Sequence, residues 1–408
     1  MTVEFISAVN VWESSELYPK PGGRPDPGYL RRYARLLEDS GFDYTLVAYH
    51  SAGYDPFTVS AAIAAATDRI KPIVALRPNT VYPTVAAQAL ATLDHLSGGR
   101  AVVHIISGGS DAEQARQGDY LSKDDRYARS GEYIGLLRRA WTETAPWSHE
   151  GRFYRFDNFA AGFPPVNGTI PVSVGGSSDA AYRVGGALGD IFGLWGEPLK
   201  ETQEQIDRVA GQARIAGRAD TPRIWVTFRP IIAETDDLAW EKACRVIEAV
   251  GRTHRGGGLL PARFRGAGAP ENVGSQRLLR IAEDAEVYDR ALWMRPAQVT
   301  GAAGASTALV GSYETVAAAI LDYIDLGASL VSIRGYDNLN DAFDYGRYIL
   351  PLVRQELRHR EVTGQRGTVV PQPPFPPRPA RPAPREADST ATASSTATAD
   401  STVQGHGS

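Results

Sequence analysis

A short polar turn, GGSSD at residues 175–179, stands between an apolar run and a helical pattern. Backbone N–H groups and serine hydroxyls at the N-terminus of a helix attract anions, phosphate in particular. The same string also fits an ordinary Gly-Ser turn in which a serine caps the helix. The residues alone therefore leave phosphate binding and simple capping both open.

Two histidines and an arginine lie within or directly after predicted strands. His50 follows the second apolar run and His104 lies in the fourth. The ordinary histidine pKa, about 6.5, suits proton transfer at neutral pH. Arg229, in the seventh run, could clamp an anionic substrate through paired hydrogen bonds. The alternatives are a surface-loop histidine, a core histidine and a structural ion pair.

The elements that position these residues form a regular alternation of apolar runs and helical patterns. Asp26-Pro27 and Asp55-Pro56 predict helix starts, and Gly41 and Gly98 predict helix ends. Several runs are apolar on both faces, which is typical of strands buried between helices. The predicted strands are Val3–Val9, Phe42–Tyr49, Lys71–Arg77, Arg100–Ser107, Pro171–Gly175, Asp190–Trp195, Arg223–Ala233 and Ser329–Tyr336.

Eight βα units in one chain predict an α/β fold, a (β/α)8 TIM barrel. The main alternative is a doubly wound open sheet, which would more often carry GxGxxG after its first strand, and that string is absent. We expect one barrel domain over residues 1–363, with insertions at about 147–170 and 252–311. At least one insertion is a candidate lid. The Pro-, Ser- and Thr-rich segment 364–408 is expected to be a disordered tail.

Composition narrows the class of function. Hydrophobic residues make up 43% of the 408 residues, enough for a large core, and the net charge of −4 without a basic stripe argues against nucleic-acid binding. One cysteine, Cys244, excludes an intramolecular disulfide. Neither a signal peptide nor a membrane span is evident, so a cytoplasmic protein is expected. Seven histidines without an HxH pair argue against a metal-dependent hydrolase and predict no metal site.

A set of strings spread along the chain resembles a known family. They are Val74–Gly108, DDRYARSGEYIGLLRRAW from Asp124, HEGRFYRF from His149, VGGSSD from Val174, LWGEP from Leu194, STALVG from Ser306 and Arg334-Gly335-Tyr336. In this order they resemble the luciferase-like flavin-dependent monooxygenases of the bacterial luciferase superfamily. The FMNH2-dependent alkanesulfonate monooxygenases are the most similar branch. The resemblance covers roughly residues 3–360.

The resemblance implies a TIM barrel that uses reduced FMN and O2 to oxygenate a small organosulfur substrate, an alkanesulfonate in particular, giving aldehyde and sulfite. It implies a separate NAD(P)H-dependent flavin reductase and a homo-oligomer, a dimer or tetramer. It also assigns cofactor contacts: Ser177, Ser178 and Tyr127 to the flavin phosphate or ribityl chain, Ala75 and Leu76 to the ring, and His104 to the flavin edge.

The resemblance also assigns the substrate side, where this chain departs from the family. His50 corresponds to a catalytic base, and Trp195 and Tyr336 to pocket residues, Tyr336 as a hydrogen-bond donor. Where the family carries an arginine and then a histidine on strand seven, this chain has Thr227 and Arg229. The family's cysteine after strand two and its lid arginine fall near Gly53 and Ala302.

These departures keep other functions open. Some barrels of this superfamily transfer hydride with the deazaflavin F420, and others oxygenate uncharged sulfur or nitrogen compounds. A flavin-binding barrel without catalysis is a further alternative. Binding of F420H2 rather than FMNH2, or flavin binding without turnover, would distinguish them.

Overall fold

The computed structural model describes residues 3–20, 23–255, 270–302 and 306–367. Eight parallel strands close into a barrel in the order β1-β14-β9-β8-β7-β4-β3-β2, which confirms the predicted TIM barrel. The barrel strands are β1 (Glu4–Ala8), β2 (Tyr44–Val47), β3 (Lys71–Leu76), β4 (Val102–Ile105), β7 (Val172–Gly175), β8 (Ile191–Trp195), β9 (Arg223–Phe228) and β14 (Ala328–Ile333).

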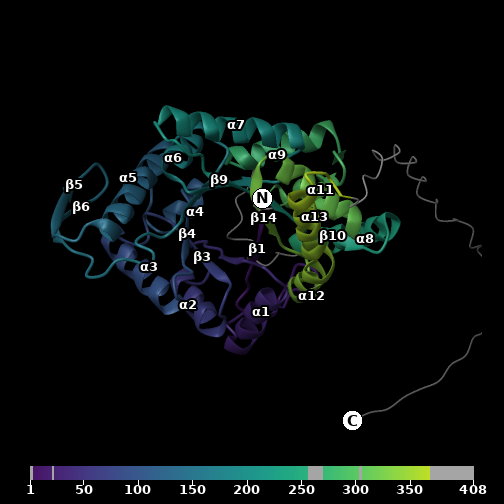
Figure 1. The fold of residues 1–408 in the computed structure, drawn as a ribbon, viewed down its shortest axis with the longest axis horizontal. Coiled ribbons are helices and arrows are strands. Elements are labelled where there is room, and N and C mark those ends of the chain that lie inside the picture. Colours follow the sequence, from purple (N-terminus) through teal and green to yellow (C-terminus); the bar gives the residue numbers. More distant parts are fainter. Residues whose placement is uncertain (1–2, 21–22, 256–269, 303–305, 368–408) are drawn as a thin grey trace, which may run out of the picture. The chain divides into compact units, whose positions relative to one another are not determined.

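Helices lie around the strands as an outer ring (Figure 1). They are α1 (Pro27–Asp39), α2 (Pro56–Ala66), α3 (Pro83–Ser97), α4 (Asp111–Ala115), α5 (Lys123–Thr142), α6 (Asp179–Leu188), α7 (Leu199–Ile215), α11 (Tyr313–Asp325), α12 (Asn338–Asp344) and α13 (Leu350–Thr363). A π-helical turn, Tyr345–Ile349, joins the last two. None of the helices in the described ranges is long and apolar enough to cross a membrane.

Seven of the eight predicted strands differ from the observed ones only at their ends. The seventh, Arg223–Ala233, is two strands: β9 stays in the barrel, and β10 (Ile231–Ala233) leaves it to pair with β13 (Ala308–Ser312). Pro230 lies at the break. Because proline has no N–H for a strand ladder, it favours such an end. The predicted helix starts also hold, since Asp26 and Asp55 accept hydrogen bonds from backbone N–H groups of α1 and α2.

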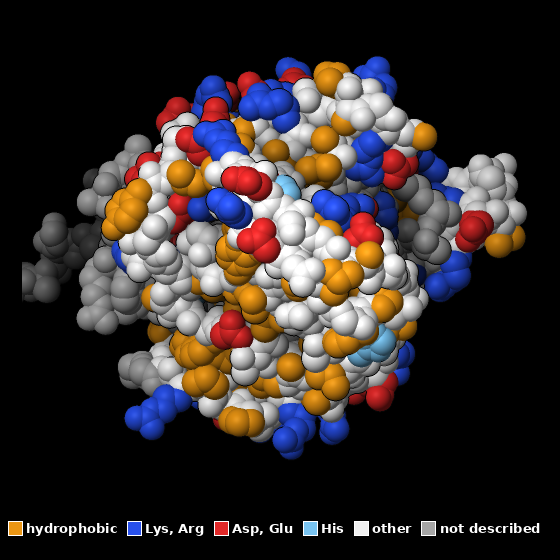
Figure 2. Space-filling view, turned by 90° about the vertical axis from the view of Figure 1, so that its left-hand side faces the viewer, with side chains coloured by type: hydrophobic (Ala, Val, Ile, Leu, Met, Phe, Trp, Pro, Cys, Tyr) orange, Lys and Arg blue, Asp and Glu red, His pale blue; other side chains and the backbone are white. Residues whose placement is uncertain are grey.

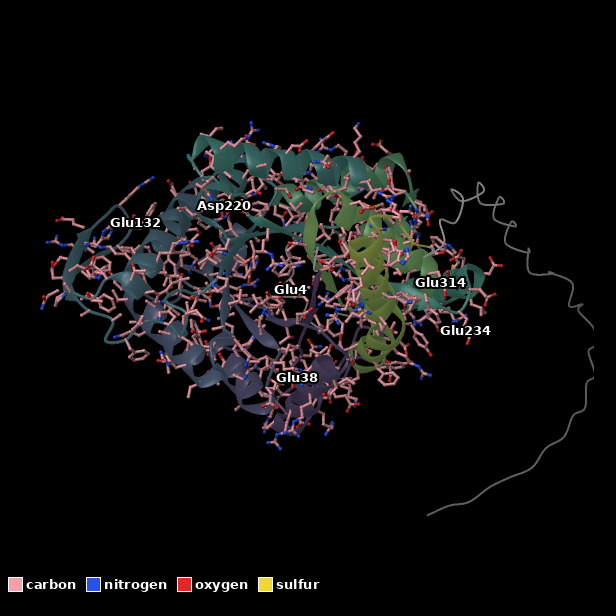
Figure 3. The ribbon with its side chains drawn as sticks, viewed as in Figure 1. Glu4, Glu38, Glu132, Asp220, Glu234 and Glu314 are labelled. Carbon is pink, nitrogen blue, oxygen red and sulfur yellow. The ribbon has the colours of Figure 1, made fainter. Side chains whose placement is uncertain are left out.

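Charged side chains close the amino end of the barrel. Glu4 forms ion pairs with Lys71 at 3.0 Å and Arg223 at 2.6 Å, and the Tyr44 hydroxyl donates to the same carboxylate. Figure 3 places Glu4 within the ring of helices, whereas Glu38 lies with α1. Above this network the interior is filled by Ile6, Tyr44, Ile73, Val102, Ile191, Trp225 and Leu330. The amino end is thereby sealed, and the opposite end is left to bind ligands.

The segments of the two predicted insertions form secondary structure in addition to the barrel. The first contains a hairpin of β5 (Trp147–Glu150) and β6 (Arg155–Phe159), on the side of the molecule that faces the viewer in Figure 2. In that view acidic and basic side chains alternate with hydrophobic ones rather than forming a field of one sign. The Trp147 ring packs against Phe156 at 4.7 Å, with the Arg139 guanidinium 4.0 Å from its centre. The hairpin therefore has a small aromatic core of its own.

The second insertion, with the helix that leads into it, builds a small sheet and three helices beside the barrel. It contains α8 (Asp236–Arg255), α9 (Val273–Asp284), β11 (Val287–Tyr288), β12 (Leu292–Trp293) and α10 (Arg295–Thr300). Strands β10, β13, β12 and β11 form one sheet in that order. Residues 256–269, and residues 368–408 of the predicted tail, lie outside the described residues.

Candidate functional site

A cavity of about 470 Å³ opens at the carboxyl ends of the barrel strands. Every barrel strand, or the turn directly after it, contributes to the lining. This volume is ordinary for a ligand pocket, and TIM barrels carry their active sites at this end. Its polar lining includes Arg77, His104, Ser107, Lys123, Tyr127, Ser177, Ser178, Thr227, Asn272, Ser332 and Arg334, and its apolar lining includes Leu46, Trp195 and Trp225.

A second, more open hollow of about 600 Å³ lies outside the barrel mouth. It is lined by the turn at 78–82, the segment 117–121 and the hairpin residues Arg152, Phe153 and Tyr154. The barrel-mouth cavity is the better candidate site although it is smaller, because the strand ends converge on it and it contains histidine, serine, lysine and arginine side chains.

The turn after β7 forms one side of the cavity. Gly176 has a φ of +133°, and a Cβ at this position would lie 2.4 Å from the Tyr127 hydroxyl, so only glycine fits without displacement. Ser178 is the N-cap of α6, because its hydroxyl accepts a hydrogen bond from the Ala181 N–H at 3.3 Å. Ser177 lines the cavity directly before it. The turn thus brings two hydroxyls and the positive end of a helix dipole to the cavity, which favours a bound anion.

Helix α5 brings a hydroxyl and an ammonium group to the same side. The Tyr127 hydroxyl donates to the Gly175 carbonyl oxygen at 3.2 Å. Burial raises the pKa of Tyr127 to about 12, so the phenol stays protonated at neutral pH. Lys123 also lines the cavity, and burial together with the neighbouring Arg126 lowers its pKa. A lysine, two serines and a helix start are the groups that hold a phosphate monoester.

His104 lies at the floor of the cavity, beside this turn. Its Nδ1 is 2.8 Å from the Ser173 hydroxyl on β7, and its ring centre is 5.2 Å from that of Trp225. Burial in the barrel lowers the pKa of His104 to about 4, so the imidazole is neutral at neutral pH. A neutral imidazole has one donor and one acceptor nitrogen, and with Nδ1 engaged, Nε2 is free to contact a ligand.

Two glycines leave room beside this histidine. A Cβ on Gly175 would lie 3.3 Å from the His104 ring, and one on Gly193 would lie 3.6 Å from the Trp225 ring. Gly175 and Gly193 pair in register on β7 and β8. Side chains at these positions would reduce the space above His104 and Trp225, so the paired glycines keep this part of the cavity open.

The second insertion covers part of the cavity. Asn272, Val273 and Gly274, at the start of α9, line it. A Cβ on Gly274 would lie 2.8 Å from the Trp195 ring at the end of β8, so the helix start packs directly on this predicted pocket residue. The Glu271 carboxylate accepts a hydrogen bond from the Asp111 N–H at 2.7 Å. The prediction that this insertion moves as a lid stays a prediction.

His50 lies at the rim, outside the lining. It is close to Arg77 and Glu113, which form an ion pair at 2.6 Å. Burial lowers the pKa of His50, and Arg77 adds to that effect while Glu113 opposes it. The Glu113 carboxylate also accepts a hydrogen bond from the Ser51 N–H at 2.8 Å. His50 therefore does not line the cavity but interacts with Arg77, which does.

Two predicted substrate-side residues lie away from the cavity. The Arg229 guanidinium forms an ion pair with Glu16 and donates to the Gly335 carbonyl at 3.0 Å. It also lies 3.7 Å from the centre of the Tyr336 ring. Neither Arg229 nor Tyr336 lines the cavity. An anion contact by Arg229 would require it to release Glu16, so this geometry favours the structural ion pair left open from the sequence.

Tyr336 and the end of β3 are buried next to the site. The Tyr336 hydroxyl is buried and has no hydrogen-bond partner among the described residues. Burial raises the pKa of Tyr336 to about 12, which keeps it a possible donor. Ala75 and Leu76 are also buried, outside the lining, and Ala75 pairs in register with His104. Ala75 and Leu76 therefore hold β4, with His104, in place and do not themselves form the cavity surface.

Sequence reasoning missed all three cationic residues of the lining, Arg77, Lys123 and Arg334. Arg334 lines the cavity directly after β14, and its Nε is buried without a hydrogen-bond partner in the described ranges. In the string Arg334-Gly335-Tyr336, only the tyrosine was predicted to be a site residue. The available signal was the position, because the first residue after a barrel strand faces the active end. No group of three or more potential metal ligands occurs among the described residues.

Known proteins share this fold. The structure is similar to riboflavin lyase with modified FMN and riboflavin (TM-score 0.70, 21% identity, 89% of this chain and 92% of the other). It is also similar to EDTA monooxygenase from Chelativorans sp. BNC1 (TM-score 0.68, 19% identity, 87% and 94%). An F420-dependent secondary alcohol dehydrogenase with an F420–acetone adduct matches as well (TM-score 0.62, 16% identity, 87% and 100%). At these identities the similarities establish the fold alone.

The family itself follows from the sequence. Residues 6–330, well over half of the chain, match the family model described as luciferase-like monooxygenase. The predicted resemblance is therefore confirmed at the level of the family, while the alkanesulfonate branch is not. This chain belongs to the luciferase-like monooxygenases.

Proposed function

We propose that this enzyme is an FMNH2- and O2-dependent monooxygenase that acts on a small organosulfur compound, with alkanesulfonates as the first substrate class to test. The observation that carries the proposal is the polar turn Gly175–Ser178, which meets Tyr127 and Lys123 at one side of a strand-end cavity. Family membership then makes a flavin phosphate the natural occupant of that side.

The residues present fit a flavin. Ser177, Ser178 and Lys123 would bind the phosphate, with the α6 dipole adding to the attraction. The open space beside Gly175 and Gly193 would accommodate the flavin ring. Reduced FMN supplies the electrons that activate O2, and the protein supplies binding, orientation and a protected site.

His104 would position the flavin edge. Because its pKa is held at about 4, it remains neutral and can exchange a hydrogen bond through Nε2 without placing a charge beside the ring. Ser173 fixes the orientation of the imidazole through Nδ1. His50 and Tyr336 are the proposed groups for proton transfer, and because neither lines the cavity, either would act through an intervening water. Trp195 forms a wall of the substrate space.

The proposed overall reaction consumes one molecule each of O2, FMNH2 and alkanesulfonate. One oxygen atom of O2 is transferred to the carbon beside the sulfonate, the C–S bond breaks, and an aldehyde and sulfite leave. The other oxygen atom becomes water, and FMNH2 is oxidised to FMN. The reduced flavin would come from a separate NAD(P)H-dependent reductase, and we place both proteins in the cytoplasm.

A homo-oligomer, dimer or tetramer, is part of the proposal. Helix α2, PFTVSAAIAAA, contains no charged residue although Thr58, Ala62 and Ala65 are exposed. Small apolar residues on an exposed helix face permit close helix–helix packing between subunits.

A hydride-transferring enzyme that uses F420 is the second candidate. It is favoured by the similarity to the F420-dependent alcohol dehydrogenase, which extends over the whole of that chain. The same fold therefore accommodates either cofactor, and the cavity must be tested with both.

The test is an anaerobic titration of the purified protein with FMNH2 and, in parallel, with F420H2. Oxygen is then admitted with a panel of alkanesulfonates, and sulfite is measured. Tight FMNH2 binding with sulfite release supports the proposal. FMNH2 binding without sulfite moves the search to other oxygenation substrates, and preference for F420H2 contradicts the monooxygenase assignment.

A further inference from the structure

Arg334 is a cation of the cavity whose charge no described carboxylate neutralises. Its side chain lines the cavity after β14, and its Nε is buried without a hydrogen-bond partner. No ion pair of its guanidinium occurs within the described residues. An arginine guanidinium stays charged in proteins and presents five N–H donors, so a buried one requires acceptors from somewhere.

The charges around Arg334 leave a positive excess. The charged groups that act on Arg334 are the Arg229 guanidinium and the Glu16 carboxylate. Glu16 is already engaged by Arg229, and one carboxylate neutralises only one of the two guanidinium groups. The Arg229 guanidinium, together with burial, lowers the pKa of Arg334, as expected for a cation beside another cation. Binding of one anion would relieve this repulsion.

The other two cations that line the cavity, Arg77 and Lys123, already have a partner or a different predicted ligand. Arg77 is paired with Glu113 at 2.6 Å. Lys123 lies on the phosphate side, with Tyr127 and the turn after β7. Strand β14 is three strands from β7 in the barrel order, close to the diametrically opposite position among eight. Arg334 is therefore a second positive centre, remote from the first.

Neutral donors accompany this second centre. Ser332 on β14 precedes Arg334 by two residues and lines the same cavity, and it pairs in register with Thr227 on β9. Both hydroxyls line the cavity. Trp225 lies two residues before Thr227, also lines the cavity, and has a buried indole N–H without a partner in the described structure. Two adjacent strands thus present a guanidinium, two hydroxyls and an indole N–H.

We propose that Arg334, with Ser332 and Thr227, forms the subsite that binds the head group of a monoanionic substrate, a sulfonate or a carboxylate. A guanidinium binds either group through paired hydrogen bonds. The proposal rests on the proposed function, in which FMN occupies the other side, and it assigns the substrate class and the residue that selects it.

The experiment measures the affinity of the full-length protein for three ligands of one chain length: hexane-1-sulfonate, heptanoate and hexan-1-ol. Calorimetric titrations are made anaerobically, with and without saturating FMNH2. The wild-type protein is expected to bind the two anions at least about tenfold more tightly than the alcohol, the value of one charge-assisted hydrogen bond. Arg334→Met should lower the affinity for both anions by about 10- to 100-fold and leave hexan-1-ol unchanged.

Three controls separate a head-group subsite from a structural or flavin role. Arg334→Lys keeps the charge and should restore part of the anion affinity. Arg290→Met removes an arginine that lies outside the cavity lining and is paired with Asp322 at 3.0 Å, and anion affinity should change by less than about threefold. Urea unfolding of Arg334→Met should show stability equal to or above that of the wild type, because an unneutralised buried charge has been removed.

The outcomes are decisive in both directions. Loss of anion affinity with unchanged FMNH2 affinity supports the subsite. Equal affinity for the alcohol and the anions, or binding of none of the three, overturns it. Loss of FMNH2 affinity with retained anion affinity assigns Arg334 to the flavin and also overturns it. Anion binding through Arg334 without sulfite release leaves this inference standing while the proposed reaction fails.

Discussion

The two sides of the cavity differ in how they are built. The side after β7 depends on backbone and short-range features: a glycine turn, an N-cap and residues from one helix. The side formed by β9, β14 and the N-terminal segment depends on which charges pair across the chain, since Arg229 and Glu16 are 213 residues apart. The first kind of site can be predicted from a local string. The second depends on pairing that no local string contains.

The largest expected effect concerns the buried ion pair. Arg229→Met leaves the Glu16 carboxylate without its main partner, and breaking such a pair costs about 3–5 kcal/mol of unfolding free energy. Urea unfolding measures it. The double variant Arg229→Met/Glu16→Leu should recover much of the loss, because neither member of this pair is then left as an unpaired buried charge. Normal stability of Arg229→Met combined with lost sulfonate binding would instead make Arg229 a substrate clamp.

A substitution that strains the backbone of the turn after β7 should weaken binding of the flavin phosphate. Gly176→Ala places a Cβ against the Tyr127 hydroxyl at a φ that alanine rarely adopts. Strain of this kind costs about 1–3 kcal/mol, so FMNH2 affinity should fall by about 5- to 100-fold. Gly168→Ala is the matched control, since its φ is +75° but nothing lies within 4 Å of the added Cβ. Equal flavin affinity in the two variants would remove the turn from the site.

The contrast between the two sides shows which parts of the fold and of the site could be predicted from the sequence. The barrel, its strands and the cluster of Tyr127, Ser177 and Ser178 follow from periodicity, capping and the family resemblance, and the structure brings these three together at one cavity. The place of Arg334 in the lining follows from its position directly after a barrel strand, but its lack of a carboxylate partner could not be predicted, because it depends on Glu16 being paired with Arg229. Tyr336 was placed at the right strand end, yet its side chain points away from the cavity lining.

The pH dependence of protein stability tests whether His104 is enclosed at the floor of the cavity. Its folded-state pKa, about 4, is below the unfolded value of about 6.5. The unfolded state therefore binds the proton first as pH falls, and stability is lost between about pH 6.5 and pH 4. Linkage gives a loss of up to about 2 kcal/mol between pH 7 and pH 5.

This part of the pH profile should disappear in His104→Asn, which keeps a polar side chain but does not titrate. Urea unfolding of both proteins across that pH range gives the comparison. A wild-type profile that runs parallel to that of the variant would mean that the imidazole titrates normally and is not enclosed as described.

The smallest effect is expected from a single hydroxyl. Ser178→Ala removes the cap of α6 and one proposed phosphate contact, with a cost of about 1 kcal/mol each to helix stability and to FMNH2 binding. Ser312→Ala, at the cap of α11 on another part of the barrel, should lower stability by a similar amount without changing flavin affinity. If both variants bind FMNH2 as the wild type does, Ser178 acts as a cap alone.

The central claim is that this cavity holds reduced FMN by its phosphate at the turn after β7. The most direct measurement compares the affinities of reduced FMN and reduced riboflavin, which differ only in the phosphate, in anaerobic titrations. The phosphate contacts of Lys123, Ser177 and Ser178 predict at least about 100-fold tighter binding of reduced FMN. Equal affinity for the two flavins would contradict the account.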